Sequence, residues 1–248
     1  MPTKVAVISG GVGAVGQALA LALAREGYTI AILYRGPHEE EVSALQGSLG
    51  GDAVFLAVDV NSPEATANAI KEVAARCGRI DVAIHAATGR IIRKKIFDLD
   101  AASFQGQLET SVIGAFNFFK PVAEIMKRQK NGTIVGITSA VAEPGAQAAR
   151  MGAYAVGKFA LRGLLRELHR ELGPDGVRVL AVAPDLMKTP LNADLPDKYF
   201  EFSVQRSQGE KLMTPEDVAA SILFLLSGEG STLRGASLLV SSGAVSNL

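Results

Sequence analysis

The stretch Lys4–Glu26 constrains the fold more than any other part of the chain. It begins with Val5–Ile8, an apolar run rich in β-branched residues, as expected of a buried strand. An Ala/Leu-rich run at residues 18–24 then has high helix propensity. Between them lies a glycine cluster, Gly10, Gly11, Gly13 and Gly16. A strand, a glycine turn and a helix in this order let the backbone approach a pyrophosphate, which the positive helix end attracts. Alternatively, they form a tight turn that binds nothing.

The rest of the chain alternates apolar, strand-like runs with amphipathic, helix-like stretches. Runs that are almost continuously apolar are typical of parallel strands buried on both faces. The expected strands are Val5–Ser9, Thr29–Tyr34, Ala53–Val58, Val82–His85, Thr133–Thr138, Val177–Ala183 and Ala236–Val240. Right-handed crossovers between them predict an α/β fold, a doubly wound Rossmann sheet of seven parallel strands with helices on both faces. We expect one domain, residues 1–248.

Residues at the ends of three strands bear on the choice of dinucleotide. After the second strand of such folds, an acidic residue binds a ribose 2′-hydroxyl, whereas an arginine suits a 2′-phosphate. Here Arg35 follows with no acid before it, so NADP(H) is favoured over NAD(H); the alternative is a solvated loop arginine. Asp59 either accepts a hydrogen bond from adenine or caps its loop. The small Ala86 and Ala87 let a cofactor approach the backbone.

Two features are expected to be structural. His85 ends the fourth strand without an evident partner, and such a histidine is more often structural than catalytic. Residues 101–130 predict a long helical region broken near Gly114. Its apolar stripe belongs either to the core or to a subunit interface and consists of Phe104, Leu108, Val112, Phe116 and Phe119.

Three further residues have the properties of a proton-transfer site. Ser139 follows the fifth strand, and Tyr154 and Lys158 lie four residues apart on one face of a helix expected to end near Leu172. A neighbouring ammonium lowers the pKa of a tyrosine, which is otherwise near 10. A serine hydroxyl can polarise a carbonyl oxygen to which the tyrosine gives a proton. The Tyr-x-x-x-Lys spacing alone also arises by chance.

Together, these segments resemble the short-chain dehydrogenases/reductases over nearly the full length of the chain. The resemblance is carried by the order of Ser9–Gly16, Asp59-Val60, Ser139, Tyr154-x-x-x-Lys158, Pro184…Thr189 and a C-terminal Leu-Arg-Gly-Ala-Ser-Leu-Leu-Val. It is nearest to the 3-oxoacyl-carrier-protein reductase-like branch. It implies hydride transfer between a nicotinamide and a carbonyl or alcohol. It also implies a homotetramer or homodimer, with contacts through apolar stripes on Ala101–Phe119 and Gly152–Leu172, although these stripes would equally suit packing on the sheet.

The resemblance implies roles for single residues. Ser139 orients the substrate oxygen, Tyr154 donates the proton, and Lys158 tunes Tyr154 and holds the nicotinamide ribose. Ser111 aligns with the asparagine that completes the family's catalytic tetrad. The expected cofactor-binding residues are Ser9, Gly10, Gly11, Val12, Gly13, Val15, Gly16, Arg35, Asp59, Val60, Ala86, Ala87, Tyr154, Lys158, Pro184, Leu186 and Thr189.

The variable stretch after Pro184, about residues 185–213, corresponds to the family's substrate lid. Its apolar side chains favour a partly apolar carbonyl or alcohol as the small-molecule substrate. Alternatively, they only pack the lid on the domain. They are Leu195, Phe200, Phe202 and Met213.

Several positions depart from the family pattern. Ala14 replaces a glycine, Asp185 replaces the glycine after Pro184, and residues 85–88 read His-Ala-Ala-Thr instead of Asn-Asn-Ala-Gly. The loop Val141–Arg150 carries an insertion, and residues 240–243 read Val-Ser-Ser-Gly instead of Val-Asp-Gly-Gly.

These departures leave two alternatives to an NADPH-dependent ketoreductase. One is a catalytically impaired NADP-binding scaffold or sensor of the same fold. The other is a different reaction in which Asp185 or Glu143 acts as an extra acid or base, although we favour solvated loop charges for both. The ketoreductase is preferred because Ser139, Tyr154 and Lys158 are all present.

The composition argues against several other functions. The 248 residues carry 25 basic and 25 acidic side chains, so no excess charge attracts nucleic acid or an anionic membrane. Three scattered histidines show no metal-ligand spacing, and the single cysteine, Cys77, allows no internal disulfide. No apolar run reaches the roughly 20 residues needed to span a bilayer, and no signal peptide precedes the first strand. We therefore expect a cytoplasmic enzyme without a metal.

Overall fold

A single sheet organises the part of the chain that the structure describes. The computed structural model describes residues 3–144, 146, 150–209 and 211–246. Within them, seven parallel strands follow the order β3-β2-β1-β4-β5-β6-β7. The predicted doubly wound α/β fold is thereby confirmed. The strands are β1 (Val5–Ser9), β2 (Thr29–Tyr34), β3 (Val54–Ala57), β4 (Val82–His85), β5 (Gly132–Ile137), β6 (Val177–Pro184) and β7 (Ser237–Val240).

Some strands begin or end at residues other than those expected, and the strands paired with them explain two of these differences. β1, β2 and β4 have the expected bounds. β3 is shorter than predicted, because it lies at the sheet edge and has a partner strand, β2, on one side only. β6 extends one residue further, to Pro184, because that residue is in register with Val240 of β7.

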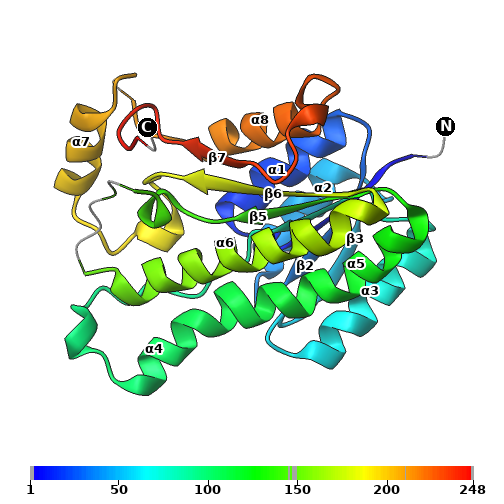
Figure 1. The fold of residues 1–248 in the computed structure, drawn as a ribbon, viewed down its shortest axis with the longest axis horizontal. Helices are drawn as coiled ribbons and strands as arrows, with labels where there is room; N and C mark the ends of the chain where they lie inside the picture. The colour runs from blue at the N-terminus through cyan, green and yellow to red at the C-terminus, as the bar shows by residue number, and fades with distance from the viewer. Residues whose placement is uncertain (1–2, 145, 147–149, 210, 247–248) are drawn as a thin grey trace.

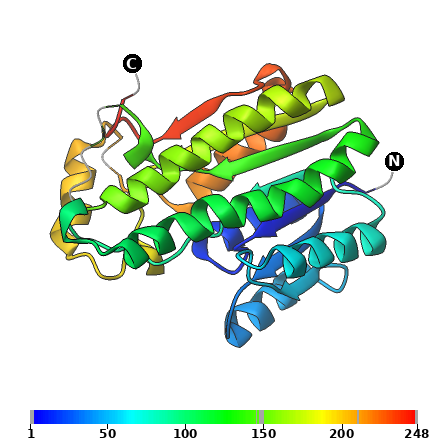
Figure 2. The same ribbon diagram turned by 60° about the horizontal axis from the view of Figure 1, so that its bottom comes forward.

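Helices cover both faces of the sheet (Figures 1 and 2). The α3, α5 and α6 helices pack on one face, where Ile70, Phe118 and Leu161 are fully buried in one core cluster. The α1 and α8 helices pack on the other face, where Leu19 and Ile222 belong to a second cluster. The central strands β1, β4 and β5 are buried along their whole length, as their continuous apolar runs predict, whereas the edge strands β3 and β7 are only partly buried.

The helices have the following bounds: α1 (Ala14–Arg25), α2 (Glu39–Leu49), α3 (Pro63–Cys77), α4 (Ala101–Leu108), α5 (Ala115–Gln129), α6 (Gly152–Leu172), α7 (Asp197–Arg206) and α8 (Pro215–Leu226). Short 3₁₀ turns are η1 (Ile96–Asp98), η3 (Ala140–Ala142), η4 (Gly173–Asp175), η5 (Pro190–Asn192) and η6 (Glu229–Thr232). No helix within the described ranges is both long enough and apolar enough to cross a membrane.

The expected break near Gly114 is a π-helical turn. α4 continues through η2 (Glu109–Gly114) directly into α5. A π turn holds one more residue than an α turn and rotates the side chains that follow it. As a result, α5 buries Phe118 and Phe119 and leaves Phe116 47% exposed. The predicted apolar stripe is therefore divided between core and surface.

The carboxyl ends of the strands form one edge of the sheet. In register, Ser9 lies opposite Leu33 and His85, and His85 lies opposite Gly136. The strand order reverses between β1 and β4, the switch point at which ligands bind in sheets of this type. The helix α7 lies at the same end of the molecule (Figure 1).

Candidate active site

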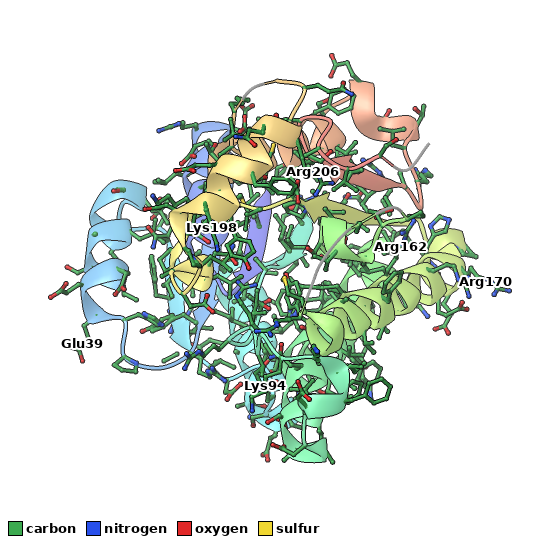
Figure 3. The ribbon with its side chains drawn as sticks, turned by 90° about the vertical axis from the view of Figure 1, so that its left-hand side faces the viewer. Glu39, Lys94, Arg162, Arg170, Lys198 and Arg206 are labelled. Atoms are coloured by element: carbon green, nitrogen blue, oxygen red, sulfur yellow. The ribbon has the colours of Figure 1, made fainter. Side chains whose placement is uncertain are left out.

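A cavity of about 1350 Å³ opens at the carboxyl ends of the strands. It is lined by the segments that follow β1, β2, β4, β5 and β6, and by the lid. Figure 3 faces this end of the sheet and shows α7, with Lys198 and Arg206, above the segment that carries Lys94. The volume of the cavity exceeds the range of about 300–1,000 Å³ that is common for sites of drug-sized ligands. It therefore has room for a ligand as long as a dinucleotide.

Most of the predicted site residues meet in this cavity. Those that line it are Gly10, Val12, Gly13, Val15, Gly16, Arg35, Asp59, Val60, Ala86, Ala87, Ser139, Tyr154, Lys158, Pro184, Leu186 and Thr189. Three predicted residues do not line it: Ser9, Gly11 and Ser111. Ser9 is bound to His85, and Gly11 packs against Ile32. Ser111 is buried beside Gly157 of α6, while its neighbour Thr110 reaches the cavity.

The glycine turn at the start of α1 requires its glycines for close packing. Gly10 has a φ of +71°, and a Cβ there would lie 2.6 Å from the backbone of Ala87. A Cβ on Gly16 would overlap the carbonyl oxygen of Gly10. Ala14, by contrast, begins the α1 helix, so its departure from glycine costs no backbone strain. The first turn of α1 carries no acidic residue, which leaves its N–H groups free to attract an anion.

Tyr154 and Lys158 are both buried, and burial controls their protonation. Lys158 Nζ lies 5.6 Å from the centre of the Tyr154 ring and donates a hydrogen bond to the Ile137 carbonyl at 2.9 Å. Loss of hydration lowers the pKa of Lys158 to about 8. Loss of hydration also raises the pKa of Tyr154, opposed in part by a hydrogen bond with Ser139 and by the charge of Arg93. Burial therefore outweighs the lowering that was expected from Lys158, and the net shift of the Tyr154 pKa is upward.

Ser139 holds the turn that follows β5. Its hydroxyl accepts a hydrogen bond from the Val141 N–H at 3.4 Å and caps η3. It lines the same cavity as Tyr154 and contributes to lowering the pKa of that phenol against burial. The predicted insertion Val141–Arg150 includes residues 145 and 147–149, which lie outside the described residues.

Glu143 is a correction to the sequence interpretation. It is a buried ion-pair partner, not a solvated loop charge: its side chain is 1% exposed and lies 3.0 Å from Arg162 Nη1. Ser237 donates a second hydrogen bond to it at 3.4 Å. It does not line the cavity, so it is not placed to act as an extra acid or base there. Asp185 does line the cavity, and burial raises the pKa of its carboxyl group.

The structure confirms that His85 is structural. Its ring is completely buried against Phe118 and Phe119, and Nδ1 lies 2.8 Å from the Ser9 hydroxyl. Burial is the main cause that lowers the pKa of His85 to about 3, so it stays neutral at physiological pH. It is not among the residues that line the cavity.

An acidic residue lies near Arg35 after all. Arg35 Nη1 is 3.7 Å from Asp59 Oδ2, and both side chains are largely exposed. Asp59 also accepts a hydrogen bond from the Asn61 N–H at 3.0 Å, the loop-capping role that the sequence left open. An exposed pair of this kind contributes roughly 0–1 kcal/mol, so Arg35 can leave Asp59 at little cost.

The lid divides the predicted apolar residues into two groups. Leu195 and Phe202 line the cavity, whereas Phe200 and Met213 are buried away from it and pack the lid. The stretch is closed at its base by a bridge between Met187 and Met213. The expected apolar lining is therefore present, and the alternative of lid packing holds for the other two residues.

The sequence interpretation missed Arg93. This residue lies in the loop after β4, lines the cavity and forms an ion pair with Asp194 of the lid. Its only sequence signal was its place in a basic run, residues 90–95, which matches no motif. Among the described residues, no group of three or more His, Cys, Asp and Glu side chains could hold a metal ion.

Comparison with known proteins identifies the family. The family model described as enoyl-(acyl carrier protein) reductase matches residues 11–245. The 3-oxoacyl-[acyl-carrier-protein] reductase of Thermotoga maritima is 30% identical, with 98% of each chain covered. The chain belongs to the short-chain dehydrogenases/reductases. A second relative of this dehydrogenase/reductase is the 3-alpha-(or 20-beta)-hydroxysteroid dehydrogenase of Mycobacterium tuberculosis, 29% identical over 99% of this chain and 90% of the relative.

Solved structures agree with this assignment. The crystal structure of gox2181 has a TM-score of 0.90 and 27% identity, covering 98% of this chain and 96% of that one. A 3-ketoacyl-(acyl-carrier-protein) reductase from Brucella melitensis, complexed with NADH, has a TM-score of 0.89 at 22% identity, covering 99% and 98%, and shares the fold. The dehydrogenase/reductase is accordingly an NAD(P)-dependent oxidoreductase.

Proposed function

We propose that this protein is an NADPH-dependent ketoreductase. The observation that carries the proposal is that Ser139, Tyr154 and Lys158 line the same cavity as the glycine turn and the first turn of α1. One end of the cavity can therefore hold a dinucleotide pyrophosphate while the other holds a carbonyl group beside a proton donor. The names of the curated relatives, a 3-oxoacyl reductase and a hydroxysteroid dehydrogenase, support a carbonyl or alcohol substrate.

The residues of the cavity suit a nicotinamide dinucleotide. Residues 10–16 and the N-terminus of α1 would hold the pyrophosphate, because the glycines let the backbone approach it and the first turn of α1 carries no acidic charge. Arg35 would hold the 2′-phosphate, and Lys158 the nicotinamide ribose. When bound, the nicotinamide supplies or accepts the hydride. The role of Ser111 in place of the family's asparagine stays a prediction, since its side chain is buried outside the cavity lining.

The raised pKa of Tyr154 suits carbonyl reduction. At neutral pH the phenol keeps its proton and can donate it to the oxygen of the carbonyl group being reduced. Ser139 holds that oxygen by a hydrogen bond. The Lys158 ammonium then lies beside the phenolate that remains and stabilises its negative charge. Together these groups would act as a general acid.

The choice between NADPH and NADH is tested by titrating both nucleotides against the purified protein and recording their fluorescence. We expect tight binding of NADPH and weak binding of NADH. The Arg35→Asp variant should weaken NADPH binding by about tenfold or more and leave NADH almost unchanged, because it removes a charged donor to the 2′-phosphate. Lys71→Asp, an exposed charge reversal on α3, is the matched control.

Other outcomes contradict parts of this proposal. Equal loss of both nucleotides in Arg35→Asp would remove Arg35 from its role, and a preference for NADH would reverse the cofactor assignment. If neither nucleotide binds, the site is disabled for the cofactor, which contradicts the ketoreductase and leaves a non-catalytic protein that retains only the fold.

We also propose that the protein assembles as a homodimer or homotetramer. Apolar side chains that are about half exposed lie on η2, α5 and α6: Ile113, Phe116, Val156 and Phe159. Large exposed apolar patches on soluble proteins commonly mark interaction sites. A second copy of the chain would cover this surface.

A further inference from the structure

Arg93 is held rigidly at the edge of the cavity. Its side chain is 15% exposed and lines the cavity in the loop after β4. Nε donates a hydrogen bond to Asp194 Oδ2 at 3.0 Å, and Nη2 donates one to Asn192 Oδ1 at 2.6 Å. Asn192 is itself fixed, because its side-chain amide donates to the Met187 carbonyl at 3.0 Å. Two nitrogens of the guanidinium are thus bound to the lid.

The third nitrogen of this guanidinium remains available. Among the described residues, Arg93 Nη1 has no hydrogen-bond partner. A guanidinium has five N–H donors in one plane, so the contacts with the lid leave donors unused. Two nitrogens of the side chain are already held in place. A ligand that binds the free nitrogen would therefore cost little further loss of side-chain conformational entropy.

The positive charge of Arg93 influences Tyr154, the proposed proton donor. It is close enough to Tyr154 to lower the pKa of that phenol against the opposite effect of burial. Arg93 and Tyr154 line one cavity, so a small molecule with its carbonyl oxygen near Tyr154 would place a neighbouring group near Arg93. Two lid side chains, Leu195 and Phe202, supply an apolar lining beyond these polar groups.

We infer that Arg93 binds a carboxylate group of the substrate, so that the preferred substrates are oxo acids with an apolar chain. This inference rests on the proposed ketoreductase function and narrows its substrate class. A carboxylate is the group that the planar fork of an arginine binds best, with two parallel hydrogen bonds. Asp194 offsets part of the positive charge, but it contacts Nε, so a substrate can bind Nη1 without displacing it.

The inference is tested with matched pairs of acid and ester. With NADPH as reductant, kcat/KM is measured for 4-methyl-2-oxopentanoate against its methyl ester and for 3-oxohexanoate against its ethyl ester. We expect the acid of at least one pair to be preferred about tenfold or more. Arg93→Met should remove that preference, lowering kcat/KM for the acid by the same factor, about tenfold or more, with a much smaller change for the ester.

Lys94→Met is the matched control, because Lys94 is the exposed neighbour of Arg93 and does not line the cavity. NADPH affinity and thermal stability are measured for each variant. If Arg93→Met lowers activity on acids and esters equally, Arg93 only fastens the lid and the inference is wrong. Equal use of acids and esters by the parent protein also overturns it, while the reductase proposal stands.

A binding measurement keeps the inference testable without turnover. Hexanoate and hexanamide have the same chain and differ in charge. Hexanoate should raise the melting temperature of the protein more than hexanamide does, and Arg93→Met should abolish that difference. An equal effect of both compounds contradicts the carboxylate site. Failure to bind NADPH, by contrast, contradicts the ketoreductase proposal. The comparison of hexanoate with hexanamide still decides whether Arg93 binds a carboxylate.

Discussion

At the scale of single residues, burial sets the protonation of the candidate site. The same loss of hydration raises the pKa of Tyr154 and lowers the pKa of Lys158, because it disfavours the charged form of each. His85 shows the same effect in a purely structural setting, where a lowered pKa keeps the ring neutral. The sequence interpretation weighed only the charge of Lys158 and left out burial, which dominates the net shift of the Tyr154 pKa.

Tyr154→Phe tests the proposed proton donor. The variant should lower kcat by about a hundredfold to ten-thousandfold, because the ring stays while the acidic hydrogen is lost. NADPH affinity should change little. Steady-state kinetics and nucleotide titration measure the two quantities separately. Retained turnover would exclude Tyr154 as the acid.

Lys158→Met tests the cost of burying an ammonium. Since the pKa of Lys158 is about 8 in the folded protein and 10.5 for a lysine in water, charging it destabilises the fold fully below pH 8. That cost disappears as the pH rises from about 8 to 10.5. The stability of the variant relative to the parent should therefore fall by about 2 kcal/mol between pH 7 and pH 9.5. Urea unfolding at both pH values measures it, and a pH-independent difference would contradict the lowered pKa.

At the scale of elements, two side chains of α6 interact with two side chains of the turn after β5. Tyr154, Lys158 and Arg162 follow one another at four-residue intervals along one face of α6. Ser139 and Glu143 are also four residues apart, at the two ends of η3. Ser139 acts on Tyr154, whose pKa it lowers against the effect of burial, and Glu143 forms an ion pair with Arg162. The buried ion pair therefore holds the serine turn in register with the helix that carries the tyrosine.

Breaking this pair from either side should have unequal effects. Arg162→Met leaves a buried, unpaired carboxylate and should lower the free energy of unfolding by about 3 kcal/mol. Glu143→Gln should cost less, because the Arg162 side chain is 39% exposed and can reach water. The double variant should be more stable than Arg162→Met alone. Urea unfolding of all three checks the order, and strictly additive effects would show that the pair is not coupled.

At the scale of the whole molecule, one sheet edge and one covered face have different roles. The segments of the candidate site meet at the carboxyl edge of the sheet. On another side of the molecule, the outer surfaces of α5 and α6 expose apolar side chains to solvent. The outward position of Phe116 follows from the π turn before α5, so a local feature of the helix shapes the proposed subunit contact.

Phe116→Glu combined with Phe159→Glu tests that contact. Both rings are about half exposed, so the charges are tolerated in the monomer but would be buried against each other in an oligomer. Sedimentation velocity should show a dimer or tetramer for the parent and a smaller species for the variant, with an unchanged circular dichroism spectrum. A parent protein that sediments as a monomer would contradict the proposed assembly.

The sequence by itself determined the fold and most of the candidate site. Continuous apolar runs require strands covered on both faces, and the glycine turn requires a close approach of backbone at Gly10. The residues that end each strand meet at one edge, because parallel strands all point the same way. Ser139 could be placed at this edge for that reason, and Tyr154 and Lys158 were grouped with it from their helical spacing and the family resemblance; all three line one cavity.

Only the tertiary structure decided the environment of each side chain. Glu143, Arg93 and Asp59 have partners that lie 19, 101 and 24 positions away in the chain, and no local pattern encodes such pairings. Burial is likewise a property of the packed molecule, so the direction of the pKa shift of Tyr154 and the outward turn of Phe116 follow from neighbours brought together by folding. Periodicity reports which face of an element is apolar; what lies against that face depends on the whole chain.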